Sequence, residues 1–224
     1  MENEKSRSLV YSIYLYLIKS LGPQGWWPAK TPLEMVIGAI LTQNTAWTNV
    51  EKAIRNLKRK RWINAAVLHK RSHSELAQTI RPSGYFNIKS VRLKNFVQIL
   101  MDQFKGRIER MFALSLPELR DLLLSIWGIG AETADSIILY GARKKIFVVD
   151  AYTRRIFSRH GFFPEEHSYE EVQNFFHQSL PKKLKIFNEY HALIVNIGKN
   201  FCRKVPLCHL CPLNQPKFYV DSLH

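Results

Sequence analysis

Asp150 is the residue whose surroundings point most directly to chemistry. It is the only acidic residue between residues 136 and 164, a stretch that also carries six lysines and arginines. A carboxyl group among positive charges stays ionised. An ionised carboxylate can stabilise a cationic transition state and can orient or deprotonate a water molecule. Asp150 could also be the N-cap of a helix that begins near Ala151, and the two roles are compatible.

Two glycines, Gly128 and Gly130, lie between an apolar helical stretch and a stretch of small residues. Glycines at this spacing allow a tight turn between two helices and a close approach of backbone N–H groups to a ligand. Because those N–H groups crown the N-terminus of the second helix, they favour an anion such as one DNA phosphate. An ordinary turn between helices has the same pattern, so the glycines alone do not decide.

Helical periodicity dominates the elements that must position these residues. Apolar residues recur at helical spacing within residues 33–41, 50–57, 91–100, 119–123 and 172–180. The one strand-like run, residues 146–149, has only four residues and is better explained as an extended connector that leads to Asp150. The sequence therefore predicts an all-α fold with about ten short helices.

The charge of the chain indicates a polyanionic partner. Its 224 residues include 33 Lys and Arg against 18 Asp and Glu, a formal net charge of +15. Residues 52–110 alone hold 15 basic and three acidic residues, and residues 58–61 (K-R-K-R) are the densest basic run. Nucleic acid is the first candidate for the partner and an acidic membrane surface is the second.

The rest of the composition favours a cytoplasmic protein. No apolar run reaches the ~18 residues that a membrane span needs, and nothing near the N-terminus has the form of a signal peptide. In a reducing compartment, three cysteines are expected as thiols or metal ligands rather than disulfides.

The hairpin glycines and Asp150 together carry a family resemblance. Residues 122–134, followed by the V-D-A-Y-T-R-R segment around Asp150, resemble the helix-hairpin-helix (HhH-GPD) superfamily of DNA glycosylases, which includes endonuclease III. Residues 41–45 (L-T-Q-N-T), residues 84–89 (G-Y-F-N-I-K) and the C-terminal cysteines are similar to three further motifs of that family. The resemblance implies that Asp150 is catalytic. It implies DNA contacts from Gln43, Asn44, Tyr85, Lys89, Gly128, Gly130 and Arg155.

The family's fold implies two helical lobes with a DNA-binding cleft between them. We expect a six-helix barrel over residues 30–137, ending in the hairpin, and a second lobe formed by residues 1–29 and 138–224. Asp150 should then lie at the mouth of the cleft. Tyr85 should fill the gap left by a flipped base, with Gln43 or Asn44 facing the orphaned partner base.

Glu132 indicates the branch of the family. Bifunctional members have a lysine at this hairpin position, and a carboxylate cannot supply the amine that forms a Schiff base with the sugar. The chain is most similar to bacterial 3-methyladenine DNA glycosylases of the endonuclease III type, which are monofunctional. That resemblance implies that Trp27 and Trp47 sandwich the flipped base. It also implies a base pocket completed by Trp26, Pro28 and Glu132.

The chemistry of 3-methyladenine agrees with such a site. The base is cationic, and two indole rings offer stacking together with a cation–π attraction of ~0.5–2 kcal/mol. Its glycosidic bond is already weak, so one carboxylate can suffice without a strong general acid. The base must leave the duplex to reach the site, which costs a few kcal/mol.

The three cysteines resemble an incomplete iron–sulfur motif. The family's motif is C-x6-C-x2-C-x5-C, whereas Cys202, Cys208 and Cys211 are separated by five and two residues and the fourth position is Lys217. Lysine does not ligate such a cluster. Loss of the [4Fe–4S] cluster and a three-cysteine site with another fourth ligand both stay open, and the chemistry itself requires no cofactor.

We therefore expect a monomeric, monofunctional DNA N-glycosylase of base excision repair. Its partner would be double-stranded DNA that contains damaged bases, 3-methyladenine above all. One alternative is a bifunctional endonuclease III-like glycosylase and lyase that acts on oxidised pyrimidine or uracil. The other is a non-catalytic hairpin protein that binds DNA structure.

Overall fold

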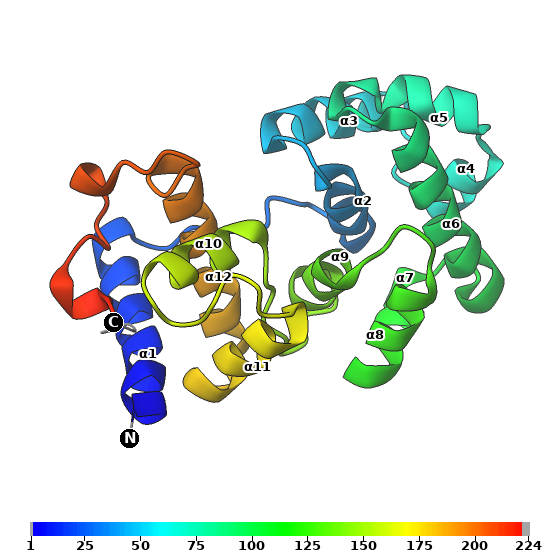
Figure 1. The fold of residues 1–224 in the computed structure, drawn as a ribbon. Coiled ribbons are helices and arrows are strands. Elements are labelled where there is room, and N and C mark those ends of the chain that lie inside the picture. Colours follow the sequence, from blue (N-terminus) through cyan, green and yellow to red (C-terminus); the bar gives the residue numbers. More distant parts are fainter. Residues whose placement is uncertain (1, 221–224) are drawn as a thin grey trace. The chain divides into compact units, whose positions relative to one another are not determined.

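The computed structural model describes residues 2–220, with side chains from Ser6 onward, and no strand occurs among them. The predicted all-α fold is confirmed. None of the described helices is long and apolar enough to span a membrane. The chain forms two compact units, one of Trp27–Lys144 and one of the residues up to Trp26 with those from Lys145 onward (Figure 1).

The boundaries of these units differ slightly from the predicted ones at residues 29/30 and 137/138. Trp27 packs within the Trp27–Lys144 unit, where its ring lies against Gly38. At the other end, the π-helical turn η2 (Ile137–Gly141) directly continues the preceding helix and packs on the helix that contains Gly38. Both contacts keep these residues with the Trp27–Lys144 unit.

The Trp27–Lys144 unit is a set of short helices around α2, which is buried along most of its length. Pro32 at the start of α2 and the Thr31 side chain, which accepts a hydrogen bond from the Glu34 N–H, fix where this helix begins. The elements are α2 (Pro32–Thr42), α3 (Trp47–Arg59), α4 (Ala65–Lys70), α5 (His73–Thr79), the 3₁₀ turn η1 (Arg81–Ser83), α6 (Phe86–Phe104), α7 (Ile108–Phe112), α8 (Leu116–Ser125), α9 (Ala131–Ser136) and η2.

The other unit packs α1 against α11 and α12, and α10 against α12 (Figure 1). A cluster of buried aromatic rings, which includes Phe157, Phe176 and Tyr190, fills its core. Its elements are α1 (Glu2–Leu21), α10 (Ala151–Arg159), α11 (Tyr169–Ser179), α12 (Leu184–Asn200) and the 3₁₀ turns η3 (Cys208–Leu210) and η4 (Pro216–Phe218).

The apolar run at residues 146–149 is a buried extended segment, as predicted, and not a strand. A buried extended backbone without a sheet partner needs other hydrogen-bonding groups. Side chains of α11 supply them: Gln173 donates to the Phe147 carbonyl at 2.6 Å, and the Phe147 N–H donates to His177 Nε2 at 2.9 Å. The Val149 N–H donates to the Tyr169 hydroxyl at 3.3 Å. These bonds fix the segment that carries Asp150.

Candidate active site

Asp150 is the N-cap of α10 and is buried, with 8% of its surface exposed. Its Oδ1 accepts hydrogen bonds from the Thr153 backbone N–H at 2.7 Å and from the Thr153 hydroxyl at 2.8 Å. The predicted cap is therefore confirmed. Its other oxygen, Oδ2, lies 3.6 Å from Nε2 of His191, a buried residue of α12.

The surroundings of Asp150 favour its ionised form. Burial opposes ionisation, but the His191 imidazole and the two Thr153 donors outweigh that effect and hold the pKa of Asp150 below its ordinary value. A buried carboxylate that is anionic at neutral pH can stabilise positive charge that develops on a substrate.

Close packing of α10 on α12 depends on a glycine. A Cβ atom on Gly198 would lie 2.3 Å from the ring of Tyr152, a distance that real Cβ atoms do not tolerate. The glycine therefore lets the first turn of α10, which follows Asp150, sit directly on α12.

Trp27, Trp47 and Tyr140 form an aromatic cluster in the Trp27–Lys144 unit. The Trp27 ring centroid lies 5.1 Å from that of Trp47 and 5.4 Å from that of Tyr140. Gly38 of α2 makes room for Trp27, because a Cβ there would lie 3.1 Å from Trp27 Nε1. The Trp47 indole N–H donates to Glu51 at 3.0 Å. The structure thus brings the two predicted base-pocket tryptophans together and adds Tyr140, which helical periodicity does not single out.

The ring geometry differs from the predicted sandwich. The planes of Trp27 and Trp47 meet at 87°, edge to face. Two rings that hold a base between their faces must be roughly parallel and about 7 Å apart, twice the ~3.5 Å contact distance of stacked carbons. One of the two side chains must therefore rotate before a base can enter between them.

The remaining predicted pocket residues are Trp26, Pro28 and Glu132. Trp26 is half-buried and is the last residue of its unit before Trp27, and Pro28 is exposed. Glu132 is exposed on the first turn of α9. It supplies a carboxylate at the start of the second helix of the hairpin.

Of the two hairpin glycines, only Gly128 has a backbone conformation that requires a glycine. Its φ is +93°, and a Cβ there would lie 2.3 Å from Cγ of Arg92. Gly130 has an ordinary φ of −93°, and a Cβ there would meet nothing within 4 Å. Gly130 is the N-cap of α9 and leaves open space at that helix start, as a phosphate-binding hairpin needs.

Gln43 stabilises the hairpin through hydrogen bonds. Its Nε2 donates to the Gly128 carbonyl and to the Thr133 hydroxyl, both at 3.0 Å. Its Oε1 accepts a hydrogen bond from the Arg92 guanidinium. Because both ends of the amide are engaged, Gln43 holds the end of α2 against the hairpin, and its contact with DNA stays a prediction.

Lys89 is buried, contrary to the expectation that it contacts DNA. It is 1% exposed, and its Nζ donates to the Leu41 carbonyl at 2.8 Å and to the Ser83 carbonyl at 2.7 Å. Burial lowers the pKa of Lys89 to about 8, with a smaller contribution from the nearby Arg92. Sequence could not reveal this, because a lysine in a basic segment is ordinarily solvated. Lys89 ties the end of α2 to the loop before α6.

Asn44 and Tyr85 follow the two segments that Lys89 joins, and both are exposed. Asn44 has φ +53° and Tyr85 has φ +44°, so both occupy the left-handed region. Tyr85 is 70% exposed at the start of α6. An exposed aromatic ring on a constrained turn suits the predicted insertion into a DNA stack.

Arg155 is half-buried and forms hydrogen bonds inside its own unit, while its predicted contact with DNA stays a prediction. Its Nε donates to the Cys202 carbonyl at 2.8 Å and its Nη2 donates to the Gly198 carbonyl at 3.3 Å. Its guanidinium lies over the Tyr152 ring at 5.2 Å. These bonds satisfy carbonyl groups at the C-terminal end of α12.

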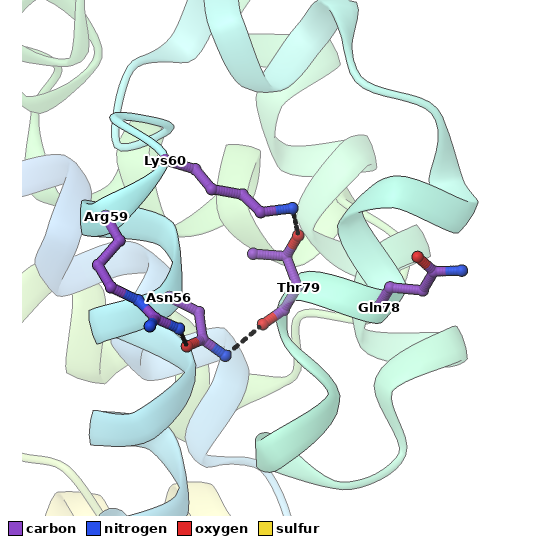
Figure 2. Close-up of a pocket in the computed structure, with 5 residues that line it drawn as sticks. All are labelled: Asn56, Arg59, Lys60, Gln78 and Thr79. Carbon is purple, nitrogen blue, oxygen red and sulfur yellow. Dashed lines mark hydrogen bonds between the residues drawn. The ribbon is translucent and has the colours of Figure 1, made fainter.

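The densest basic run, residues 58–61, mainly holds helices together. The end of α3 lines a surface pocket of about 500 Å³. There Lys60 donates to the Thr79 hydroxyl at 3.1 Å, and Asn56 donates to the Thr79 carbonyl at 3.0 Å (Figure 2). Arg59 donates to the Asn56 side chain at 2.6 Å. The two bonds to Thr79 connect the end of α3 to the end of α5, so part of the positive charge of residues 52–110 stabilises the fold.

The three cysteines line one small cavity of about 90 Å³, but they do not form a four-thiolate site. Lys217, at the fourth motif position, lies over the rings of Tyr16 and Phe218, at 5.2 and 5.0 Å. Among the described residues, no group of three or more side chains is placed to hold a metal ion. A [4Fe–4S] cluster held by four thiolates therefore does not fit these residues. The cavity is lined by Cys202, Cys208 and Cys211 together with Ile156, Arg159, His160, Ile197, Phe201, Pro206, Asn214 and Tyr219.

Comparison with known proteins places this arrangement in a family. The model of the HhH-GPD superfamily of base excision DNA repair proteins matches residues 37–182. A protein of Methanocaldococcus jannaschii, provisionally named a DNA repair glycosylase, is 46% identical over 95% of this chain and 97% of its own length.

Two solved structures extend the likeness. The 3-methyladenine DNA glycosylase of H. pylori, bound to 1,N6-ethenoadenine, has a TM-score of 0.73 and 29% identity, covering 87% of this chain and 97% of that one. Endonuclease III, trapped as a covalent intermediate with DNA, has a TM-score of 0.79 over 92% and 93% of the two chains. At 21% identity, the second likeness shows the fold alone. Because the family match includes the hairpin and Asp150 and spans most of the chain, this protein belongs to the HhH-GPD superfamily of base excision DNA repair proteins.

Proposed function

We propose that this DNA glycosylase of base excision repair is monofunctional and removes alkylated purines, 3-methyladenine above all, from double-stranded DNA. The observation that carries the substrate class is the cluster of Trp27, Trp47 and Tyr140. A cationic, electron-poor purine is attracted to aromatic faces by stacking and by cation–π interaction. The H. pylori relative, whose named substrate is 3-methyladenine, supports the same class.

The chain's own residues account for hydrolysis. As the C1′–N bond breaks, positive charge develops on the sugar, and the Asp150 carboxylate stabilises that charge. A water molecule attacks C1′, and its proton passes to Asp150 and then to solvent. The cationic base leaves as neutral 3-methyladenine, because it takes the electrons of the broken bond. The products are the free base and an abasic site.

Glu132 supports a reaction that stops at the abasic site. Strand cleavage by the lyase route needs an amine that forms a Schiff base with C1′, and Glu132 stands where that amine would be. The buried ammonium of Lys89 is bonded to two carbonyl groups inside its own unit, so it does not supply the missing nucleophile.

Base release from defined duplexes tests the proposal. We expect the wild-type protein to release 3-methyladenine from methylated DNA, and borohydride to trap no covalent complex. Release of uracil or thymine glycol in place of methylated purine would overturn the substrate class, and a trapped complex would overturn the monofunctional assignment. A protein that binds damaged DNA but releases no base would be a structural DNA-binding protein.

Single substitutions separate the pocket from the fold. Trp27→Ala should reduce release of 3-methyladenine strongly, because it removes the ring at the centre of the cluster. Trp62→Ala is the matched control in the same unit, since Trp62 lies instead under the cations of Lys60 and Arg71. Equal loss of base release in the two variants would count against a base pocket at Trp27.

A further inference from the structure

His191 lies beside the oxygen of Asp150 that the helix cap does not use. Oδ1 of Asp150 accepts both hydrogen bonds from Thr153. Oδ2 faces Nε2 of His191 at 3.6 Å. The two residues come from different helices, α10 and α12, and both are buried, with 8% and 5% of their surfaces exposed.

Because the two carboxylate oxygens have different partners, they have different roles. Oδ1 fixes the carboxyl group to the start of α10. Oδ2 is then the oxygen available to a water molecule or to a developing cation, and its orientation depends on what lies next to it. An imidazole at this distance attracts the carboxylate when it is protonated and can donate a hydrogen bond after a small movement.

We propose that His191 is a positioning residue for the reaction, which orients Oδ2 of Asp150 and keeps that carboxylate anionic in its buried site. This inference rests on the proposed role of Asp150 and extends it to a residue of a second helix. A histidine inside the apolar run of residues 190–194 was visible in the sequence, but only the fold places it against Asp150.

Other titratable and charged side chains of the helices packed on α12 make the following contacts. From α10, the Arg155 guanidinium bonds to the carbonyl groups of Gly198 and Cys202, and Arg154 bonds to the His167 carbonyl. From α1, the Tyr14 ring lies against Tyr190, at 5.3 Å between centroids. From α11, the His177 ring stacks on Phe187. Asp150 presents Oδ2 to Nε2 of His191 at 3.6 Å.

The titration of Asp150 in the free protein tests this directly. The ¹³Cγ shift of Asp150, followed by NMR, should report a pKa below the ordinary aspartate value in the wild-type protein. In His191→Gln, the midpoint should move to higher pH, because burial then acts without the opposing imidazole. His191→Asn serves as a second variant if the first is poorly folded.

The matched control is His160→Gln, which replaces another buried histidine of the same unit. His160 contacts the Phe218 carbonyl at 3.0 Å and has no contact with Asp150. This substitution should leave the Asp150 midpoint unchanged even if it lowers the melting temperature.

Single-turnover base release supplies the second readout. In His191→Gln the rate should fall at least tenfold at pH 6 and recover as the pH rises, because a higher pH restores the Asp150 anion. An unchanged Asp150 midpoint, or a rate lowered by one factor at every pH, would overturn the role of His191 alone. Retained base release by Asp150→Asn, or none by the wild type, would instead overturn the proposed function.

Discussion

Replacing Lys89 with methionine should alter both the stability of the protein and its pH dependence. The ammonium donates two buried hydrogen bonds, to the carbonyls of Leu41 and Ser83. Lys89→Met leaves these buried carbonyl groups without a donor, which costs about 1–3 kcal/mol, so the free energy of unfolding should fall by about 1–3 kcal/mol at pH 7. Methionine has a similar length and fills the same space without a donor.

The pH dependence follows from the lowered pKa of Lys89. Its folded-state pKa is about 8, against 10.5 for an ordinary lysine. Between these values the unfolded chain binds more protons than the folded chain, so the free energy of unfolding rises with pH. From pH 7 to pH 10, the two pKa values give an upper limit of about 2.5 kcal/mol for the increase in the free energy of unfolding. Solvent screening reduces this increase to about 1–2 kcal/mol.

The assay is urea unfolding at pH 7 and pH 10, followed by circular dichroism. The stability difference between the wild type and Lys89→Met should widen by about 1–2 kcal/mol at pH 10, because the variant lacks the titrating group. Lys52→Met, which changes an exposed lysine of α3, is the control and should show no such widening. If the stability difference between the wild type and Lys89→Met is equal at the two pH values, or is smaller at pH 10, Lys89 is not a buried lysine with a lowered pKa.

Three further predictions concern positions where exposure, packing or backbone conformation constrains the residue. Tyr85→Ala should weaken binding to lesion-containing DNA about tenfold in a fluorescence anisotropy titration without changing the melting temperature, because the ring is 70% exposed; equal binding would remove Tyr85 from the DNA interface. Gly198→Ala should lower the free energy of unfolding by about 1–3 kcal/mol in urea, since its Cβ would overlap the Tyr152 ring; a neutral effect would contradict the close contact of α10 and α12. Gly128→Ala should lower the melting temperature more than Gly130→Ala, because only Gly128 has a positive φ and a neighbour within 3 Å; the reverse order would contradict the hairpin geometry.

Local features of this fold could be predicted from the sequence because neighbouring residues determine them. The helical class follows from apolar periodicity, and Asp150 caps α10 as the adjacent sequence indicates. The buried connector at residues 146–149 was too short to be a strand, and α11 supplies its hydrogen bonds. The exposure of Tyr85 likewise agrees with its turn.

The roles of long polar side chains could not be predicted in the same way. Lys89, Arg155 and Gln43 match motif positions, yet each bonds to backbone carbonyls that lie far away in sequence. A motif fixes where a residue occurs in the chain, whereas its hydrogen-bond partners depend on tertiary packing. The edge-to-face angle of Trp27 and Trp47 is likewise set by tertiary packing, and Trp27 lies directly against Gly38.

Hydrolysis in the proposed reaction depends most on the anionic Asp150. The decisive measurement compares single-turnover release of 3-methyladenine by the wild type and by Asp150→Asn, on the same methylated duplex and with binding to abasic DNA measured in parallel. We predict that the variant binds abasic DNA as the wild type does and releases no methylated base, because asparagine keeps the size of the side chain and removes its charge. Turnover by Asp150→Asn at the wild-type rate would contradict the central claim.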